Sequence, residues 1–141
     1  MLDAVLVVAG VIEKEGKVFI AQRSNPNDPL FKSWEFPGGK VRPGETPQAS
    51  LVRELQEELN ITVDVGDLLV EGFYKYPHIA IRLQAYRCVW KEGELKLNSH
   101  GDYAWVFPEE ISNYNLSPAD YIIVERLLEG KGHRFKNKKA D

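Results

Sequence analysis

The stretch that decides the fold runs Gly39-Lys-Val-Arg-Pro-Gly-Glu-Thr-Pro-Gln-Ala-Ser-Leu-Val-Arg-Glu-Leu-Gln-Glu-Glu-Leu-Asn-Ile61. Within it, Thr46-Pro47 predicts a helix start, because threonine caps free backbone N–H groups and proline lacks the N–H that would be unpaired there. Asn60 suits a left-handed helix end. The sequence therefore predicts a helix over residues 47–59. Its apolar stripe at helical spacing is formed by Leu51, Val52, Leu55 and Leu59.

Three glutamates lie on the side of this predicted helix next to the apolar stripe. At about 100° per residue, Glu54, Glu57 and Glu58 fall within a single arc. Like charges at these spacings destabilise a helix, so a neutralising partner is expected. Mg²⁺ prefers carboxylate oxygens and bridges to substrate phosphates, which suits this arc. The alternative is a solvated helix face on which Arg53 and Glu57 form an ordinary ion pair.

The rest of the chain is predicted to be mostly strand. Residues 3–13 and 17–23 are β-prone runs on either side of a turn. Ser117-Pro118 repeats the helix-start pattern, and the helix that follows should stop at Gly130. Further strands are predicted at residues 67–76, 79–90 and 103–107. A mixed sheet, with one helix in the middle of the chain and another at its end, indicates an α/β fold.

Length and charge limit the domain organisation and the partners. A chain of 141 residues fits one domain, placed at residues 1–130, and the basic tail at residues 131–141 is expected to be mobile. Because five of the 18 lysines and arginines lie in that tail, the body is acidic, which argues against a stable nucleic-acid partner. Cys88 is the only cysteine, so no intrachain disulfide is possible. The apolar run at residues 2–12 contains Asp3 and is too short to span a membrane, so we expect a cytoplasmic protein without a membrane partner.

The segment from Gly39 to Ile61 reads G-x5-E-x7-R-E-U-x-E-E-x-N-U, where U is aliphatic, and it resembles the signature of the Nudix hydrolases. The matching positions are Gly39, Glu45, Arg53, Glu54, Leu55, Glu57, Glu58 and Ile61. Asn60 departs from the family, which usually has glycine there, but asparagine also tolerates positive φ. Beyond the motif, residues 34–40, Arg23 and residues 116–120 look like the MutT branch, and the likeness covers residues 3–129.

This resemblance implies a Nudix-type α/β/α sandwich, in which a central mixed β-sheet carries a loop–helix–loop catalytic motif. It also implies a Mg²⁺-dependent pyrophosphohydrolase, with Mn²⁺ as a substitute, that cleaves a small (deoxy)nucleoside triphosphate to monophosphate and pyrophosphate. House-cleaning of (d)CTP-type or modified nucleotides by a monomer or homodimer is expected. The alternatives are a MutT-type 8-oxo-dGTP diphosphatase and, from another class, a non-catalytic Nudix-fold nucleotide sensor.

The resemblance also implies roles for the motif residues. The implied metal ligands are the backbone carbonyl of Gly39 and the carboxylates of Glu54, Glu57 and Glu58, one of which would activate the attacking water. Arg53 belongs to the catalytic set and pairs with Glu45, which would fix the loop against the helix. Arg23 is expected to bind a phosphate, since a guanidinium can contact two oxygens at once, although it could also be a surface cation.

The base-binding residues implied by the resemblance are Phe36, Tyr76, Ile79, Ile81 and Asp120. A carboxylate at Asp120 would accept from the amino group of cytosine or guanine, which favours the CTP pyrophosphohydrolases. Alternatively, Asp120 lies in the first turn of the last helix, where negative charge is favourable. Related enzymes often carry a glutamate at the position of Ser99. The general base therefore stays open between the helix glutamates and this loop, where His100 and Asp102 lie close by.

Overall fold

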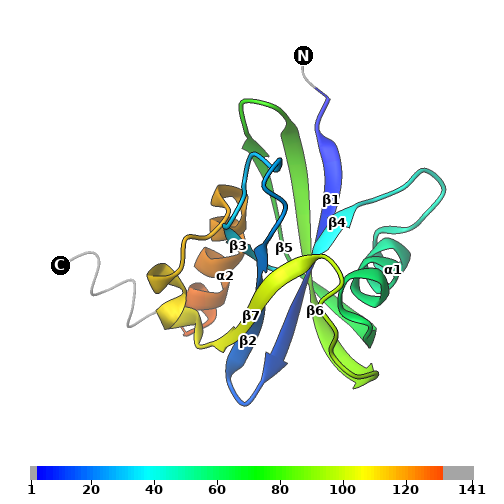
Figure 1. Cartoon of the computed structure of the whole chain (residues 1–141), viewed down its shortest axis with the longest axis vertical. Helices are drawn as coiled ribbons and strands as arrows, with labels where there is room; N and C mark the ends of the chain where they lie inside the picture. Colours follow the sequence, from blue (N-terminus) through cyan, green and yellow to red (C-terminus); the bar gives the residue numbers. More distant parts are fainter. Residues whose placement is uncertain (1–2, 132–141) are drawn as a thin grey trace.

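The computed structural model describes residues 3–131. Two helices lie on opposite sides of a central sheet, which confirms the expected α/β/α sandwich (Figure 1). The tail predicted to be mobile falls outside the described residues, except for Lys131, which ends the last helix. The elements in chain order are β1 (Val5–Lys14), β2 (Lys17–Arg23), β3 (Trp34–Glu35), β4 (Gly38–Lys40), α1 (Pro47–Leu59), β5 (Thr62–Lys75), β6 (Ala80–Glu92), β7 (His100–Val106), two 3-10 turns (Pro108–Asn113 and Pro118–Asp120) and α2 (Tyr121–Lys131).

The sheet is mixed because one of its pairings is parallel. The strand order is β3-β2-β1-β6-β5, with β4 paired to β1 and β7 paired to β2. β1 runs parallel to β6 and antiparallel to β2 and β4. The predicted turn joins β1 to β2, and both its residues, Glu15 and Gly16, have positive φ (54° and 82°), as a tight hairpin requires. β1 therefore lies at the centre, with the glycines of β4 directly beside it.

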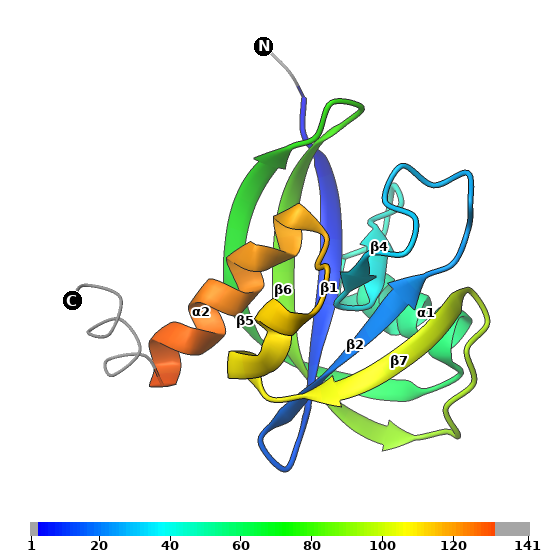
Figure 2. The same ribbon diagram turned by 60° about the vertical axis from the view of Figure 1, so that its left-hand side comes forward.

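Each face of the sheet has its own apolar core. Figure 2 shows α2 in front of the sheet and α1 behind it. The helix side chains buried in these cores are Leu51, Leu55 and Leu59 from α1 and Ile123, Val124 and Leu127 from α2. Among residues 3–131, no helix is long and apolar enough to cross a membrane.

Helix α1 begins and ends where the sequence predicts. The Thr46 hydroxyl accepts a hydrogen bond from the Ala49 N–H at 3.1 Å, and Asn60 ends the helix with a φ of 61°. One side chain of the predicted stripe was assigned wrongly, because Val52 is 36% exposed and Ser50 is buried instead. Val52 lies at the outer edge of the stripe, whereas the Ser50 hydroxyl points inward to the motif loop and donates to Glu45.

Two strands start earlier than predicted. β5 starts at Thr62 rather than at residue 67, because two irregularities in its pairing with β6 absorb the polar stretch before Leu68. β7 starts at His100 rather than at residue 103, because pairing with β2 continues past a shift in register near Arg23. Both extensions rest on cross-strand pairing that the local sequence does not show.

The start of the last helix also differs from the prediction. Ser117 makes no capping hydrogen bond, Pro118–Asp120 forms a separate 3-10 turn, and α2 runs from Tyr121 one residue past Gly130. The Ser117 hydroxyl instead lies 2.8 Å from the hydroxyl of Ser33, in a buried pair. This separate turn leaves Asp120 before α2 rather than inside its first turn.

Truncating a side chain should lower the free energy of unfolding more on the buried side of α1 than on its exposed edge. Leu55 is fully buried, so Leu55→Ala should lower the free energy of unfolding by about 2–5 kcal/mol through lost burial and a cavity. Val52→Ala, on the exposed edge, should cost less than about 1 kcal/mol. Urea denaturation of both variants measures this difference, and equal losses would contradict the placement of Val52.

Candidate active site

A cavity of about 270 Å³ opens beside the two glycines of β4. Arg23 and Gly39 line this cavity. All five predicted base-binding residues line it as well, namely Phe36, Tyr76, Ile79, Ile81 and Asp120. These residues come from the link between β3 and β4, the β5–β6 hairpin and the turn before α2. The fold therefore gathers into one wall side chains that are far apart in the sequence.

Asp120 is buried in this wall and is bonded to the chain at Phe36. The Phe36 N–H donates to Asp120 Oδ2 at 2.8 Å, and the Ala119 N–H donates to the Tyr76 hydroxyl at 2.9 Å. Burial, and next the negative charge of Glu35, raises the pKa of Asp120 to about 8. At neutral pH this carboxyl is therefore largely protonated, so it can donate a hydrogen bond as well as accept one.

Two of the motif glutamates lie next to the glycines. A Cβ atom on Gly39 would come within 1.7 Å of Glu54 Oε2, so only glycine lets this carboxylate approach the backbone. Glu58 lies beside Gly38, and its Oε1 atom is buried with no hydrogen-bond partner among the described residues. Burial, and next the charges of Glu35 and Glu54, raises the pKa of Glu58 to about 9, and burial also raises the pKa of Glu54.

Arg53 connects the motif loop to the helix carboxylates. Its Nε and Nη2 donate to the two oxygens of Glu45 at 2.7 and 2.9 Å, and its Nη1 donates to Glu54 at 3.1 Å and to Glu57 at 3.2 Å. Hydrogen bonds from Arg53, and next from Ser50, lower the pKa of Glu45 to about 2. Arg53 thus fixes the loop against α1 and holds two of the three motif carboxylates.

The three motif carboxylates do not converge on a single point. Glu57 is 50% exposed and faces Arg53, and no group of three or more His, Cys, Asp or Glu side chains within residues 3–131 is arranged to hold a metal ion. The buried, unpartnered Oε1 of Glu58 nevertheless fits a hard divalent cation, because such an ion binds carboxylate oxygens and would compensate their buried charge. The close approach of Glu54 to Gly39 adds a second oxygen beside it.

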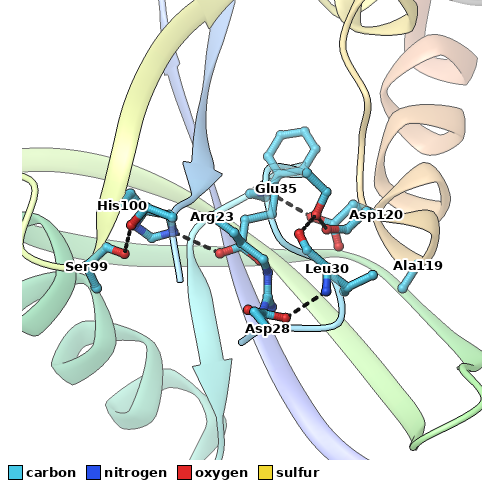
Figure 3. A network of polar contacts seen from close by, with 12 residues as sticks. Arg23, Asp28, Leu30, Glu35, Ser99, His100, Ala119 and Asp120 are labelled. Carbon is cyan, nitrogen blue, oxygen red and sulfur yellow. Dashed lines mark hydrogen bonds and ion pairs between the residues drawn. The ribbon is translucent and has the colours of Figure 1, made fainter. Parts of the chain in front are cut away.

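Glu35 is a site residue that the sequence analysis missed. It borders both the cavity and a neighbouring polar hollow, which Glu58 and Ser99 also line. Figure 3 shows its contacts: Oε1 accepts from Arg23 Nε at 2.9 Å, and Oε2 lies 2.8 Å from His100 Nε2. The available signal was a lone carboxylate between two aromatic residues, in the stretch that leads to the glycines.

Arg23 is bound to carboxylates and still faces the cavity. Its Nη1 pairs with Asp28, and its side chain is 33% exposed. His100 and Asp102, which the sequence placed in a loop, lie in β7. His100 reaches the site through Glu35, whereas Asp102 is exposed and its side chain accepts from the next backbone N–H. The Ser99 carbonyl accepts from a serine hydroxyl at 3.2 Å and adds no acid to the site.

One family model covers most of the chain: the NUDIX domain model matches residues 2–127. Among curated relatives, the CTP pyrophosphohydrolase of Escherichia coli K12 is 38% identical over 122 residues, which cover 86% of this chain and 90% of that protein. The 8-oxo-dGTP diphosphatase of Haemophilus influenzae is 34% identical over 130 residues, which cover 92% of this chain and 94% of that protein.

Solved structures share the fold. The solution structure of the Escherichia coli ORF135 protein matches with a TM-score of 0.80 at 36% identity, covering 94% of each chain. The crystal structure of a MutT protein from Methanosarcina mazei Go1 matches with a TM-score of 0.80 at 24% identity, covering 94% of this chain and 99% of that one. At that identity the second likeness concerns the fold alone.

The buried carboxyls predict that the metal-free protein loses stability as pH rises from 5 to 9. The pKa values of Glu58 and Asp120 are about 9 and 8 in the folded protein, against 4.5 and 3.8 ordinarily, so the folded state holds extra protons in this window. Stability is highest below the lower values, falls with rising pH while the folded state holds protons that the unfolded state has released, and levels off above the folded pKa values.

Thermal denaturation in EDTA measures this loss, and Tm should fall by about 5 °C or more across the window. Glu58→Gln should flatten the decline, because the amide does not ionise. A Tm that stays constant or rises with pH in the unsubstituted protein would contradict the burial of these groups.

Proposed function

The chain belongs to the NUDIX domain family and is a pyrophosphohydrolase of that family. From this premise we propose that it cleaves (d)CTP-type or modified nucleoside triphosphates to monophosphate and pyrophosphate, and that it does so in the cytoplasm. The observation that carries this proposal is a cavity with Asp120 in its wall beside a polar hollow that Glu58 lines, where one carboxylate oxygen of Glu58 has no hydrogen-bond partner among the described residues. The 38% identity with the Escherichia coli CTP pyrophosphohydrolase, over most of both chains, supports the (d)CTP class.

A second candidate substrate is 8-oxo-dGTP, which the Haemophilus influenzae relative is named for. The protonated form of Asp120 supports this candidate, because a carboxyl that both donates and accepts can pair with a guanine edge as well as with cytosine. A non-catalytic sensor is not favoured, since every glutamate of the motif is present and Arg53 binds Glu45 as well as Glu54 and Glu57.

The proposed metal is Mg²⁺, with Mn²⁺ as a substitute, since Nudix hydrolases generally need a divalent cation. When bound, a divalent cation would supply neutralisation of phosphate charge and a lower pKa for the attacking water. The residues that would hold it are the Gly39 carbonyl and the carboxylates of Glu54, Glu57 and Glu58. Of these, Glu58 has a buried oxygen without a hydrogen-bond partner in the described part of the chain.

The chain's own residues bind and orient the nucleotide. In the proposed complex, apolar and aromatic side chains enclose the base, and the Asp120 carboxyl bonds to its edge. The Arg23 guanidinium binds a phosphate, and Arg53 keeps Glu54 and Glu57 in place. Water attacks a phosphorus of the anhydride that joins the α- and β-phosphates, and a motif glutamate accepts its proton. The P–O bond of that anhydride breaks, so that pyrophosphate and the nucleoside monophosphate leave. The substrate is a small molecule, and a monomer or a homodimer can carry this site.

Removal of one motif charge tests the proposed function. Glu58→Gln keeps the size of the side chain and should lower kcat by about 10²-fold or more, the scale of losing a positioned catalytic group. The assay is pyrophosphate release from CTP, dCTP, 5-methyl-dCTP and 8-oxo-dGTP with Mg²⁺. Glu13→Gln is a matched control, because Glu13 is half exposed and forms an ion pair with Arg87 on the surface, away from the site. Full activity in Glu58→Gln would overturn the role of Glu58, and no pyrophosphate from any substrate would overturn the function.

A substitution in the predicted nucleobase-binding wall tests the role of Asp120. Asp120→Asn keeps an acceptor for the Phe36 N–H and provides a donor at every pH. We expect the relative kcat/KM values of CTP and 8-oxo-dGTP to change by about tenfold, the scale of one base-edge hydrogen-bonding pair. Parallel assays at pH 7 and pH 9 should show a pH-dependent preference in the parent protein that disappears in the variant. An unchanged ranking would leave Asp120 only its structural bond to Phe36.

A further inference from the structure

His100 is buried next to the polar hollow and makes one side-chain hydrogen bond. Its side chain is 4% exposed, its Nε2 lies 2.8 Å from Glu35 Oε2, and its Nδ1 is buried with no partner among the described residues. An ionised carboxylate can only accept, so Nε2 is the donor to Glu35. This hydrogen bond orders Glu35 but leaves Nδ1 of His100 buried without a hydrogen bond to the described residues. Because such an unsatisfied buried nitrogen is unfavourable, we infer a role for His100 beyond packing.

An irregularity in the sheet brings His100 to this contact. Gln22 pairs with Asp102, but Arg23 pairs with His100, which leaves Gly101 as an extra residue of β7. In a regular ladder, Gly101 would lie opposite Arg23 and the His100 side chain would lie on the other face of the sheet. The bulge therefore places a histidine, rather than a glycine, beside Arg23.

Glu35 reaches the same face from β3. It pairs with Ala21, two residues before Arg23, so the side chains of Glu35 and Arg23 share a face. Because His100 is opposite Arg23 across the bulge, the three side chains meet there although they come from three different strands. Figure 3 shows them in contact, with Asp28 on the far side of the guanidinium.

One nitrogen of the Arg23 guanidinium makes no hydrogen bond to the described residues. Nε donates to Glu35 and Nη1 pairs with Asp28, while Nη2 makes no hydrogen bond to any described residue. The group is planar, so fixing Nε and Nη1 also fixes the direction of Nη2. The arrangement leaves the two N–H donors of Nη2 available to a ligand.

We propose that His100 is a positioning residue, which by holding Glu35 keeps Nη2 of Arg23 available for a substrate phosphate. The proposal rests on the phosphate-binding role proposed above for Arg23. Without its bond to His100, Glu35 is free to rotate and to accept hydrogen bonds from both Nε and Nη2 of Arg23. Glu45 accepts from the same two nitrogens of Arg53 in this chain. That rotation would remove the donor that the phosphate needs.

Two substitutions at His100 separate this role from packing. Glutamine places an amide N–H₂ near the position of Nε2 and can still donate to Glu35, whereas asparagine is too short to reach beyond the position of Nδ1. We expect His100→Asn to weaken binding of α,β-methylene-CTP with Mg²⁺ by about tenfold and His100→Gln to stay within about threefold, since a hydrogen bond to a charged group is worth about one order of magnitude or more. Calorimetric titration measures the Kd without requiring hydrolysis.

Kinetics and a double substitution complete the test. In His100→Asn, KM should rise about tenfold while kcat changes less than about threefold, because the phosphate contact is made in the ground state and the transition state alike. In an Arg23→Ala background, His100→Asn should weaken binding no further, since the group it acts through is gone. Asp102→Asn, at the exposed neighbour across the bulge, is the matched control and should bind normally.

Several results would overturn the proposal. Unchanged binding in His100→Asn would do so, as would equal weakening in His100→Asn and His100→Gln, additive effects with Arg23→Ala, or no analogue binding by the parent protein. The proposed function fails separately: a parent protein that binds the analogue but releases no pyrophosphate from any triphosphate would leave the role of His100 standing and remove the hydrolase.

Discussion

An uncompensated carboxylate oxygen at the end of α1 is the constraint on which the site depends. Glu58 Oε1 is buried without a hydrogen-bond partner in the described part of the chain, and Glu35 and Glu54 add negative charge around it. Burying a charge in this way is unfavourable unless a proton or a cation compensates it. No lysine or arginine within residues 3–131 bonds to Oε1, so this position is suited to a proton or to a divalent ion in its place.

The surrounding structure holds this arrangement by close backbone approach and by ion pairing. Gly39 has no side chain, which lets Glu54 lie against the backbone of β4, and β4 is paired to the central strand β1. On the outer side, Arg53 binds Glu45 through two nitrogens and donates to Glu57 through a third. Helix α1, the motif loop and the sheet are therefore connected by a few directed contacts, around which the two apolar cores supply most of the burial.

The sequence predicts those parts of the site whose causes are local. The caps of α1 and the spacing of its glutamates are set within a few residues, so the helix bounds and the motif are confirmed. By contrast, the contact of Glu35 with His100 joins residues 65 positions apart and depends on a bulge at Gly101. The protonation of Asp120 depends on burial, which composition and spacing do not show. Strand pairing and desolvation, rather than the chemical type of the residues, determine the Glu35–His100 contact and the protonation of Asp120.

Proton release on metal binding tests the central claim most directly. Mg²⁺ titrated into the protein at pH 7.5, in buffers of different ionisation enthalpy, reports how many protons leave as the ion binds. Since the pKa of Glu58 is about 9 without metal, binding should release about one proton, and Glu58→Gln should abolish the release. Tight binding with no proton release, or release that persists in Glu58→Gln, would contradict the account.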